Sequence, residues 1–230
     1  MKRIPLLFYW GFQSLILDAQ DLNSISITFQ PLFGNSQVQL NEKYFKFSNG
    51  DSIQFQSLQF YVSEIAFFNN EDLIYREENS FHLVNATEPK TQQINFSLPG
   101  TTAATHLNFN LGIDSVTNVS GAMGGDLDPT KGMYWTWQSG YINFKLEGKS
   151  NRCKTRNNEY QFHLGGYQFP LNSIQKISLD ITGKKFIPIL FDLEKILSAI
   201  NLETQNYIMS PSDDAIHFSE QVSKHFIVKK

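Results

Sequence analysis

The sequence predicts an all-β protein, an antiparallel β-sandwich with one or two short helices near its C-terminus. Three observations support this fold class. Apolar residues recur at every second position through most of the chain, which is typical of strands with one buried face. Gly, Pro, Asn and Asp gather between these runs, as they do in turns. The 20 Phe residues bring the aromatic content to 14%, and aromatic side chains favour strands.

The alternating runs, taken in order, give the expected strands. They cover residues 24–30, 57–65, 106–113, 141–148, 159–165, 174–182 and 186–191. In the first of them, the apolar face is formed by Ile25, Ile27 and Phe29. The turn signals SNGD, NNED, LPGT and ITGK separate several of the runs. Strands of this number and spacing pack as two facing sheets.

Two helical segments are expected after the strands. Residues 192–201 have an apolar stripe at helical spacing, and Asp192 stands where an N-cap would be. A second short helix is expected within residues 210–226, capped by Ser212. Both helices lie near the C-terminus, where they can cover an end of the sandwich.

The N-terminal segment has the layout of a secretory signal peptide. Lys2 and Arg3 precede an apolar run over residues 4–17, and a small residue follows that run. We therefore predict a signal peptide over residues 1–19 and a single domain over residues 20–230, located in the periplasm or at the cell surface. The alternative is a buried N-terminal helix. No later segment is long enough to span a bilayer, so no membrane span is expected.

Composition excludes several classes of function. The net charge of −3 offers no basic surplus for binding nucleic acid. The single cysteine, Cys153, can form neither an internal disulfide nor a thiolate cluster for zinc or iron–sulfur. The sequence has no GxSxG elbow, no HExxH helix and no phosphate-binding glycine loop. We therefore expect that the protein is not an enzyme.

Three histidines leave the apolar face of their predicted strands. His82 lies opposite Phe81 and Leu83 in phase, and His106 and His163 are placed in the same way within their own runs. Each of these histidines, taken alone, is typical of a solvated surface residue. Together, and near an aromatic segment, they indicate a metal site, because neutral imidazole is the commonest metal ligand and suits copper.

The aromatic segment GMYWTWQSGY, residues 132–141, contains Trp135 and Trp137. Within a strand both indoles would project to one face and Thr136 to the other. Two interpretations remain open. Both rings could fill one end of the sandwich, or one could be structural while the other lies at a metal or oxidation site.

Three acidic residues gather just before this segment, at Asp114, Asp126 and Asp128. Oxygen ligands at such spacing could hold calcium, although the order of an EF-hand is missing. The alternative is an Asp-rich turn in which the carboxylates accept backbone N–H groups.

The run LGIDSVTNVSGAMGGDLDPTKGMYWTWQSGYINFKLEG, followed by FHLGGY, resembles the MbnP family of exported copper-binding proteins. That family is named for its association with the copper chelator methanobactin. The resemblance covers residues 24–228 and is strongest over residues 107–167. FHLV at residues 81–84 and YIMSP at residues 207–211 add to it. It implies a mainly β domain in the periplasm or at the cell surface.

The resemblance also implies a site. In characterised relatives, histidines and kynurenine, an oxidised tryptophan, hold the copper, and a di-haem, peroxidase-like partner is implied for the oxidation. The positions here that match the motif are Trp135, Trp137, His82 and His163, while His106 is a third histidine candidate outside the motif. We expect the imidazoles of His82 and His163 to converge on one ion beside the two tryptophans.

The sequence thus predicts an exported, non-catalytic copper-binding protein for storage, delivery or scavenging. The alternative is a recognition or structural module of the cell envelope that binds no metal. A copper redox enzyme is disfavoured, because no further cofactor motif is visible.

Overall fold

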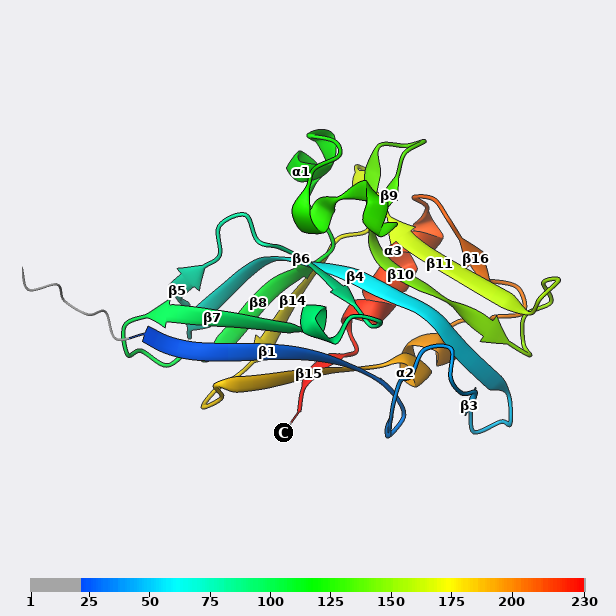
Figure 1. The fold of residues 1–230 in the computed structure, drawn as a ribbon, viewed down its shortest axis with the longest axis horizontal. Coiled ribbons are helices and arrows are strands. Elements are labelled where there is room, and N and C mark those ends of the chain that lie inside the picture. The colour runs from blue at the N-terminus through cyan, green and yellow to red at the C-terminus, as the bar shows by residue number, and fades with distance from the viewer. Residues whose placement is uncertain (1–21, 230) are drawn as a thin grey trace, which may run out of the picture.

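The computed structural model describes residues 22–229, which form a β-sandwich of two facing sheets (Figure 1). The smaller sheet contains β1 (Leu22–Phe33), β2 (Ser36–Gln37), β7 (Gln93–Pro99), β15 (Phe186–Asp192) and β17 (Phe226–Val228). The core strands of the larger sheet are β4 (Ser52–Asn69), β8 (His106–Leu111), β10 (Gly140–Ser150), β11 (Glu159–Gly165) and β14 (Gln175–Asp180). Short strands extend it: β3 (Phe45–Lys46), β5 (Asp72–Arg76), β6 (Phe81–Asn85), β9 (Tyr134–Trp135) and β16 (Tyr207–Ile208).

The remaining elements are short. A separate hairpin joins β12 (Tyr167–Gln168) to β13 (Leu171–Asn172). The helices are α1 (Ser115–Val119), α2 (Leu193–Ser198) and α3 (Asp213–Ser223), with 3-10 turns η1 (Pro89–Gln92), η2 (Gly125–Leu127) and η3 (Pro129–Lys131). Within residues 22–229, none of the helices combines the length and apolar character needed to cross a membrane. The predicted signal peptide lies outside the described residues.

The predicted sandwich is confirmed, with two corrections to its details. The sheets are mixed, because β1 pairs with β15 in parallel and β11 pairs with β16 in parallel. Each parallel pair joins segments far apart in the chain, so the connection has room to return to the same end before the second strand begins. The two C-terminal helices are confirmed, and α1 is an additional helix in the middle of the chain.

Both predicted helix caps are present. The side chain of Asp192 accepts the backbone N–H of Glu194 at the start of α2. The hydroxyl of Ser212 accepts the backbone N–H of Ala215 at the start of α3. Each cap satisfies a donor that the first helical turn leaves free.

The long strand β4 organises the larger sheet. Phe60 pairs with Phe144 of β10 and also with Val84 of β6, so β10 and β6 lie on opposite edges of β4. Val62 pairs in the same way with Leu111 of β8 and with β6. β10 and β8 therefore follow one another along a single edge of β4. The first half of β4 pairs with β10, and the second half pairs with β8.

Phenylalanine rings fill the space between the two sheets. The ring of Phe60 on β4 meets those of Phe29, Phe191 and Phe226 edge to face, at centroid distances of 5.5, 5.4 and 5.8 Å. Edge-to-face pairs at these distances add to the free energy gained by burying the rings. The three partners come from β1, β15 and β17, so Phe60 ties both sheets together.

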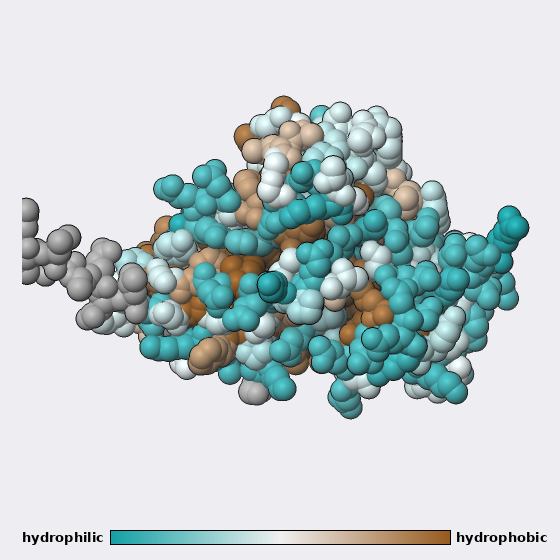
Figure 2. Space-filling model, viewed as in Figure 1, coloured by the Kyte–Doolittle hydropathy of each residue, from teal (hydrophilic) through white to brown (hydrophobic). Residues whose placement is uncertain are grey.

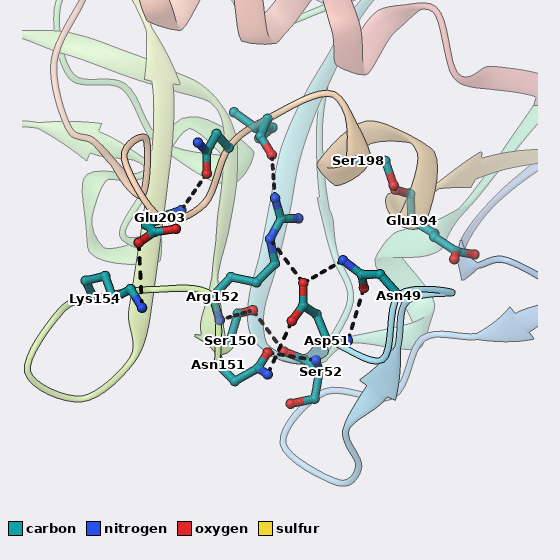
Figure 3. Close-up of polar contacts among 12 residues, drawn as sticks. Asn49, Asp51, Ser52, Ser150, Asn151, Arg152, Lys154, Glu194, Ser198 and Glu203 are labelled. Atoms are coloured by element: carbon teal, nitrogen blue, oxygen red, sulfur yellow. Dashed lines mark hydrogen bonds and ion pairs between the residues drawn. The ribbon is translucent and has the colours of Figure 1, made fainter.

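A polar network closes the end of the sandwich where β4 begins (Figure 3). Asn151 accepts the backbone N–H of Ser52 at 2.8 Å, and the Ser150 hydroxyl donates to the Ser52 carbonyl at 2.8 Å. Arg152 lies 3.6 Å from Asp51 and donates to the Ile200 carbonyl at 3.3 Å. The network joins the turn before β4, the loop after β10 and the segment after α2.

Replacing Phe60 by alanine should lower the free energy of unfolding by about 3–5 kcal/mol, because a cavity would form between rings of both sheets. Chemical denaturation of the purified variant measures the loss. The matched control is Phe186→Ala, at a position exposed to solvent, which should change stability by less than about 0.5 kcal/mol. Equal effects at the two positions would contradict the central place given to Phe60.

Candidate functional site

Residues 112–139, which join β8 to β10, form a cap on the outer face of the larger sheet. The cap contains α1, η2, η3 and β9, and α1 and β9 project together at the top of Figure 1. It packs on the sheet through an apolar cluster separate from the main core. The members of this cluster are Tyr61, Leu83, Ile113, Leu127, Met133, Trp135, Tyr141 and Ile142. The larger sheet is therefore apolar on both faces where the cap covers it.

Two buried asparagines hold the cap to the sheet. Asn118 donates to the Ile113 carbonyl at 2.9 Å and accepts the backbone N–H of Tyr141 at 2.8 Å. Asn143 accepts the backbone N–H of Ile113 at 3.0 Å and donates to the Ser173 hydroxyl at 2.9 Å. Buried amides with partners on both atoms fix one geometry, because a shift of the cap would leave polar atoms unpaired.

Two buried tyrosines add hydroxyl donors beneath the cap. Tyr61 donates to the Asp126 carbonyl at 3.0 Å, and Tyr141 donates to the Leu127 carbonyl at 3.1 Å. Burial raises the pKa of both phenols above its usual range, so both stay neutral and able to donate. Ile142 belongs to the cap cluster and Phe144, two residues later, to the main core, because the register of β10 shifts between them.

The three aspartates are engaged by nearby donors. Asp114 caps α1 by accepting the backbone N–H of Thr117 at 2.9 Å, and Asp128 accepts that of Thr130 at 2.8 Å. The Asp126 carboxylate accepts the backbone N–H of Leu83 at 3.1 Å and pairs with Lys131 at 2.7 Å. Each of the three carboxylates therefore has a partner within the chain, as an Asp-rich turn requires, and calcium at these residues stays a prediction.

Trp135 and Trp137 occupy different environments. Trp135 is only 6% exposed, and its ring lies 2.6 Å from where a Cβ on Gly165 would be, so only glycine fits beneath it. Its indole N–H has no hydrogen-bond partner within residues 22–229. Trp137 is 66% exposed, with its ring centroid 5.9 Å from that of Trp135. One ring is therefore structural and the other accessible.

The strand expected through both tryptophans is shorter than predicted. β9 ends at Trp135, and residues 136–139 form the turn into β10. The sequence pattern did not locate this turn, because aromatic and threonine residues favour strands and no glycine stands between Gly132 and Gly140. The two indoles meet through the turn and not by strand alternation.

His163 lies on the same outer face as the tryptophans. In β11 it stands two residues before Gly165, the residue under the Trp135 ring, a separation of about 7 Å along a strand. His163 Nε2 and Glu147 Oε1 are 2.6 Å apart, and Lys145 Nζ lies 3.8 Å from the same carboxylate. The hydrogen bond with His163 lowers the pKa of Glu147, and the charge of Lys145 adds to this effect.

His82 faces the opposite side of the sheet. It pairs with Val62, a member of the main core, and paired residues of an antiparallel ladder project to the same face. Its Nε2 lies 2.8 Å from Glu77 Oε2, which also accepts the Ser80 hydroxyl at 2.6 Å. Burial alone would raise the pKa of Glu77, but these hydrogen bonds outweigh it and lower the pKa.

His106 lies at the far end of the larger sheet. It pairs with Phe68 on β4, whereas His163 aligns through Lys145 with Gln59. Nine residues of strand separate these two levels, roughly 30 Å at about 3.3 Å per residue. Its Nδ1 is 2.9 Å from the Thr105 hydroxyl.

The structure thus does not bring the three histidines together. The expected convergence of His82 and His163 on one ion is corrected, because the two rings lie on opposite faces of the sheet. The strand phase of His82 was predicted correctly. Leu83, however, belongs to the cap cluster on the outer face of the sheet. The opposite face, where His82 lies, is therefore the face that covers the main core. Sequence alternation cannot distinguish two apolar faces.

The possible metal donors around His163 fit copper in part. His163 has its Nε2 oriented by a carboxylate, the arrangement that often supports a metal-ligating imidazole, and its other ring nitrogen has no partner within the described residues. Across residues 22–229, however, no group of three or more His, Cys, Asp and Glu side chains is placed to hold a metal ion. The tryptophans would add a donor only after oxidation to kynurenine.

The site includes functional residues that sequence reasoning did not single out. Glu147 orients His163, and Asn118 and Asn143 position the cap. Alternation in the run YINFKLEG does place Glu147 outward. Its partner on the neighbouring strand depends on register, which the sequence does not contain.

The family model described as MbnP matches residues 22–210. A solved structure, MbnP from Methylosinus trichosporium, is similar with a TM-score of 0.60, covering 77% of this chain and 78% of that chain at 13% identity. A likeness at this identity shows a shared fold. A search of curated proteins gave no match.

Glu147→Gln should flatten the acid limb of the stability profile. The pKa of Glu147 is lowered in the folded protein from its ordinary value of 4.5, so its contribution to stability is present above pH 4.5 and is lost as the pH falls through the lowered value. The wild type should therefore lose stability between pH 4.5 and lower pH more steeply than the variant. Denaturant unfolding at a series of pH values measures both slopes. Exposed Glu42→Gln is the control and should keep the wild-type slope.

Proposed function

The chain belongs to the MbnP family, and from this premise we propose that it is an exported, non-catalytic copper-binding protein that stores, delivers or scavenges the metal. One observation supports the proposal most directly. His163, fixed by Glu147, lies on the same face as the Trp135 and Trp137 pair, within the segment that resembles the family motif. Imidazole nitrogen suits both oxidation states of copper.

His163 would hold copper through the ring nitrogen that does not bond to Glu147. The carboxylate would keep the imidazole in one orientation and one tautomer. Lys145, close to the same carboxylate, would hold Glu147 ionised and in place. His82 and His106 lie elsewhere on the sheet, so any copper bound to them would be at separate positions.

The second donor in this proposal is a kynurenine formed from Trp137. Its exposure makes it accessible to a partner protein, whereas Trp135 is buried over Gly165. Conversion to kynurenine breaks the C2–C3 bond of the indole. Oxidation adds one oxygen atom to each of these carbons, and hydrolysis then releases C2 as formate, which leaves an aniline nitrogen and a ketone oxygen. A di-haem, peroxidase-like protein would supply the oxidant, as the family resemblance implies.

A recognition module without metal is the second candidate. It is favoured by the absence of a three-ligand group in residues 22–229 and by the exposure of Trp137. Copper titration separates the two candidates, because only the first requires tight binding of about one equivalent.

Titration with Cu(I) and Cu(II) tests the metal proposal. His163→Ala should weaken binding at least tenfold, and Glu147→Gln should weaken it about 10–100-fold, the usual effect of losing a carboxylate that orients a ligand. His217→Ala, at an exposed position on α3, is the matched control and should bind as the wild type does. Identical isotherms for His163→Ala and His217→Ala would rule His163 out as a ligand.

Intact-mass measurement of protein from the native host tests export and oxidation together. Loss of residues 1–19 would establish cleavage of the signal peptide, and retention of Met1 would contradict it.

Co-production with the peroxidase-like partner should exchange one carbon for one oxygen in the protein, and peptide mapping should place the change at Trp137. Trp137→Phe should abolish this mass change and keep the fold. A change mapped to Trp135 would reverse the roles of the two rings.

A further inference from the structure

Large apolar side chains are exposed together at the end of the molecule formed by the cap and the β12–β13 hairpin. We call this surface the apolar end. Its exposed members are Val116, Val119, Met123, Trp137 and Phe169. Phe169 is 98% exposed and Val116 78%. Scattered exposed apolar residues are normal in soluble proteins, but a gathering of them marks an interaction surface.

Hydrogen bonds show that the segments carrying these residues are neighbours. The Ser115 hydroxyl, at the start of α1, donates to the Tyr167 carbonyl of β12 at 2.6 Å. The Tyr167 hydroxyl donates to the Ser139 carbonyl, in the turn after Trp137, at 3.4 Å. Gln138 and Phe169 line one surface hollow. In Figure 2 brown and tan atoms gather at the top, over the region of α1 in Figure 1.

The same segments carry no charge. Residues 115–125, 132–144 and 165–175 contain no Asp, Glu, Lys, Arg or His, in a chain whose charged content is 18%. Charged residues stand immediately outside them, for example Asp114 and Lys145. A surface of this kind can enter a medium of low polarity, because no ionised side chain must leave water with it.

The shape of the surface narrows the choice of partner. The exposed side chains stand on α1 and the loop after it, on the turn after β9 and on the turn between β12 and β13. They therefore form separate projections, called tips below, and not a flat patch. A folded protein partner would need a hollow for each tip, whereas the interfacial layer of a bilayer adapts to them. Trp and Phe are also side chains favoured at that layer.

The support beneath the tips is rigid. Asn118 in α1 donates to the Ile113 carbonyl within the cap and accepts the backbone N–H of Tyr141 on β10, and Trp135 is buried directly beside Trp137. Because the cap is already ordered, docking requires little loss of conformational entropy.

We infer that the apolar end docks on the interfacial layer of a zwitterionic phospholipid bilayer, with Val116, Val119 and Phe169 inserted beside Trp137. No basic residue lies within the three segments, so anionic lipid contributes no attraction there. Docking is therefore insensitive to salt and to the anionic lipid content. This peripheral contact leaves His163 untouched and shares only Trp137 with the copper proposal.

Sedimentation with phosphatidylcholine vesicles tests the inference on the mature, full-length protein. The wild type should bind, and the bound fraction should be the same at low and high salt. The variant Val116→Ser/Val119→Ser/Phe169→Ser should reduce the partition coefficient at least tenfold while its melting temperature stays close to that of the wild type. Binding should also protect Trp137 from a water-soluble fluorescence quencher.

The control variant is Phe186→Ser/Ile227→Ser, which removes two exposed apolar side chains from the smaller sheet. It should bind vesicles as the wild type does. Absence of wild-type binding, dependence on anionic lipid, or equal loss in the control would each overturn the inference. Dimerisation of the wild type in solution, abolished in the triple variant, would assign the surface to a second copy of the chain instead. Copper titration of the triple variant keeps the two proposals distinguishable.

Discussion

The structure depends on the strand β4, because apolar layers cover both of its faces. Successive residues of β4 point in opposite directions, so Phe60 and Val62 enter the space between the sheets while Tyr61 enters the cluster under the cap. The smaller sheet covers the first face and residues 112–139 cover the second. The alternation of residues 58–63 in β4 therefore sets both part of the main core and the base of the candidate site.

The cap depends on this strand through polar groups as well as packing. Tyr61 donates to the carbonyl of Asp126, and the Asp126 carboxylate accepts from Leu83 on the neighbouring strand. Asn118 and Asn143 complete the attachment with buried amides whose donors and acceptors are paired. A segment rich in Gly, Ser and Asn thus acquires a fixed shape from its contacts with the sheet, since its own helix, α1, is too short to be stable alone.

This attachment presents two different surfaces side by side. One surrounds His163 and Glu147, on the same face of the sheet as Trp135, and there charge and hydrogen bonding orient an imidazole. The other is the uncharged group of tips on α1 and the adjacent turns. Trp137 borders both surfaces, because its ring contacts Trp135 on one side and it is largely exposed. The proposed metal chemistry and the proposed docking surface therefore rest on the same rigid cap.

Local patterns in the sequence determined the strands, the two C-terminal helices with their caps at Asp192 and Ser212, and the motif of the family. These features depend on residues a few positions apart, so spacing alone contains them. The tertiary structure decided what depends on distant segments: the parallel pairing of β1 with β15, the turn that separates Trp137 from β9, and the partners of each histidine. Alternation correctly placed His82 opposite Leu83, but both faces of that strand are apolar, and only the packing of the cap shows which is the outer one. His163 and Glu147 meet because β10 and β11 pair in one register, and register is set by contacts between strands that no single strand specifies.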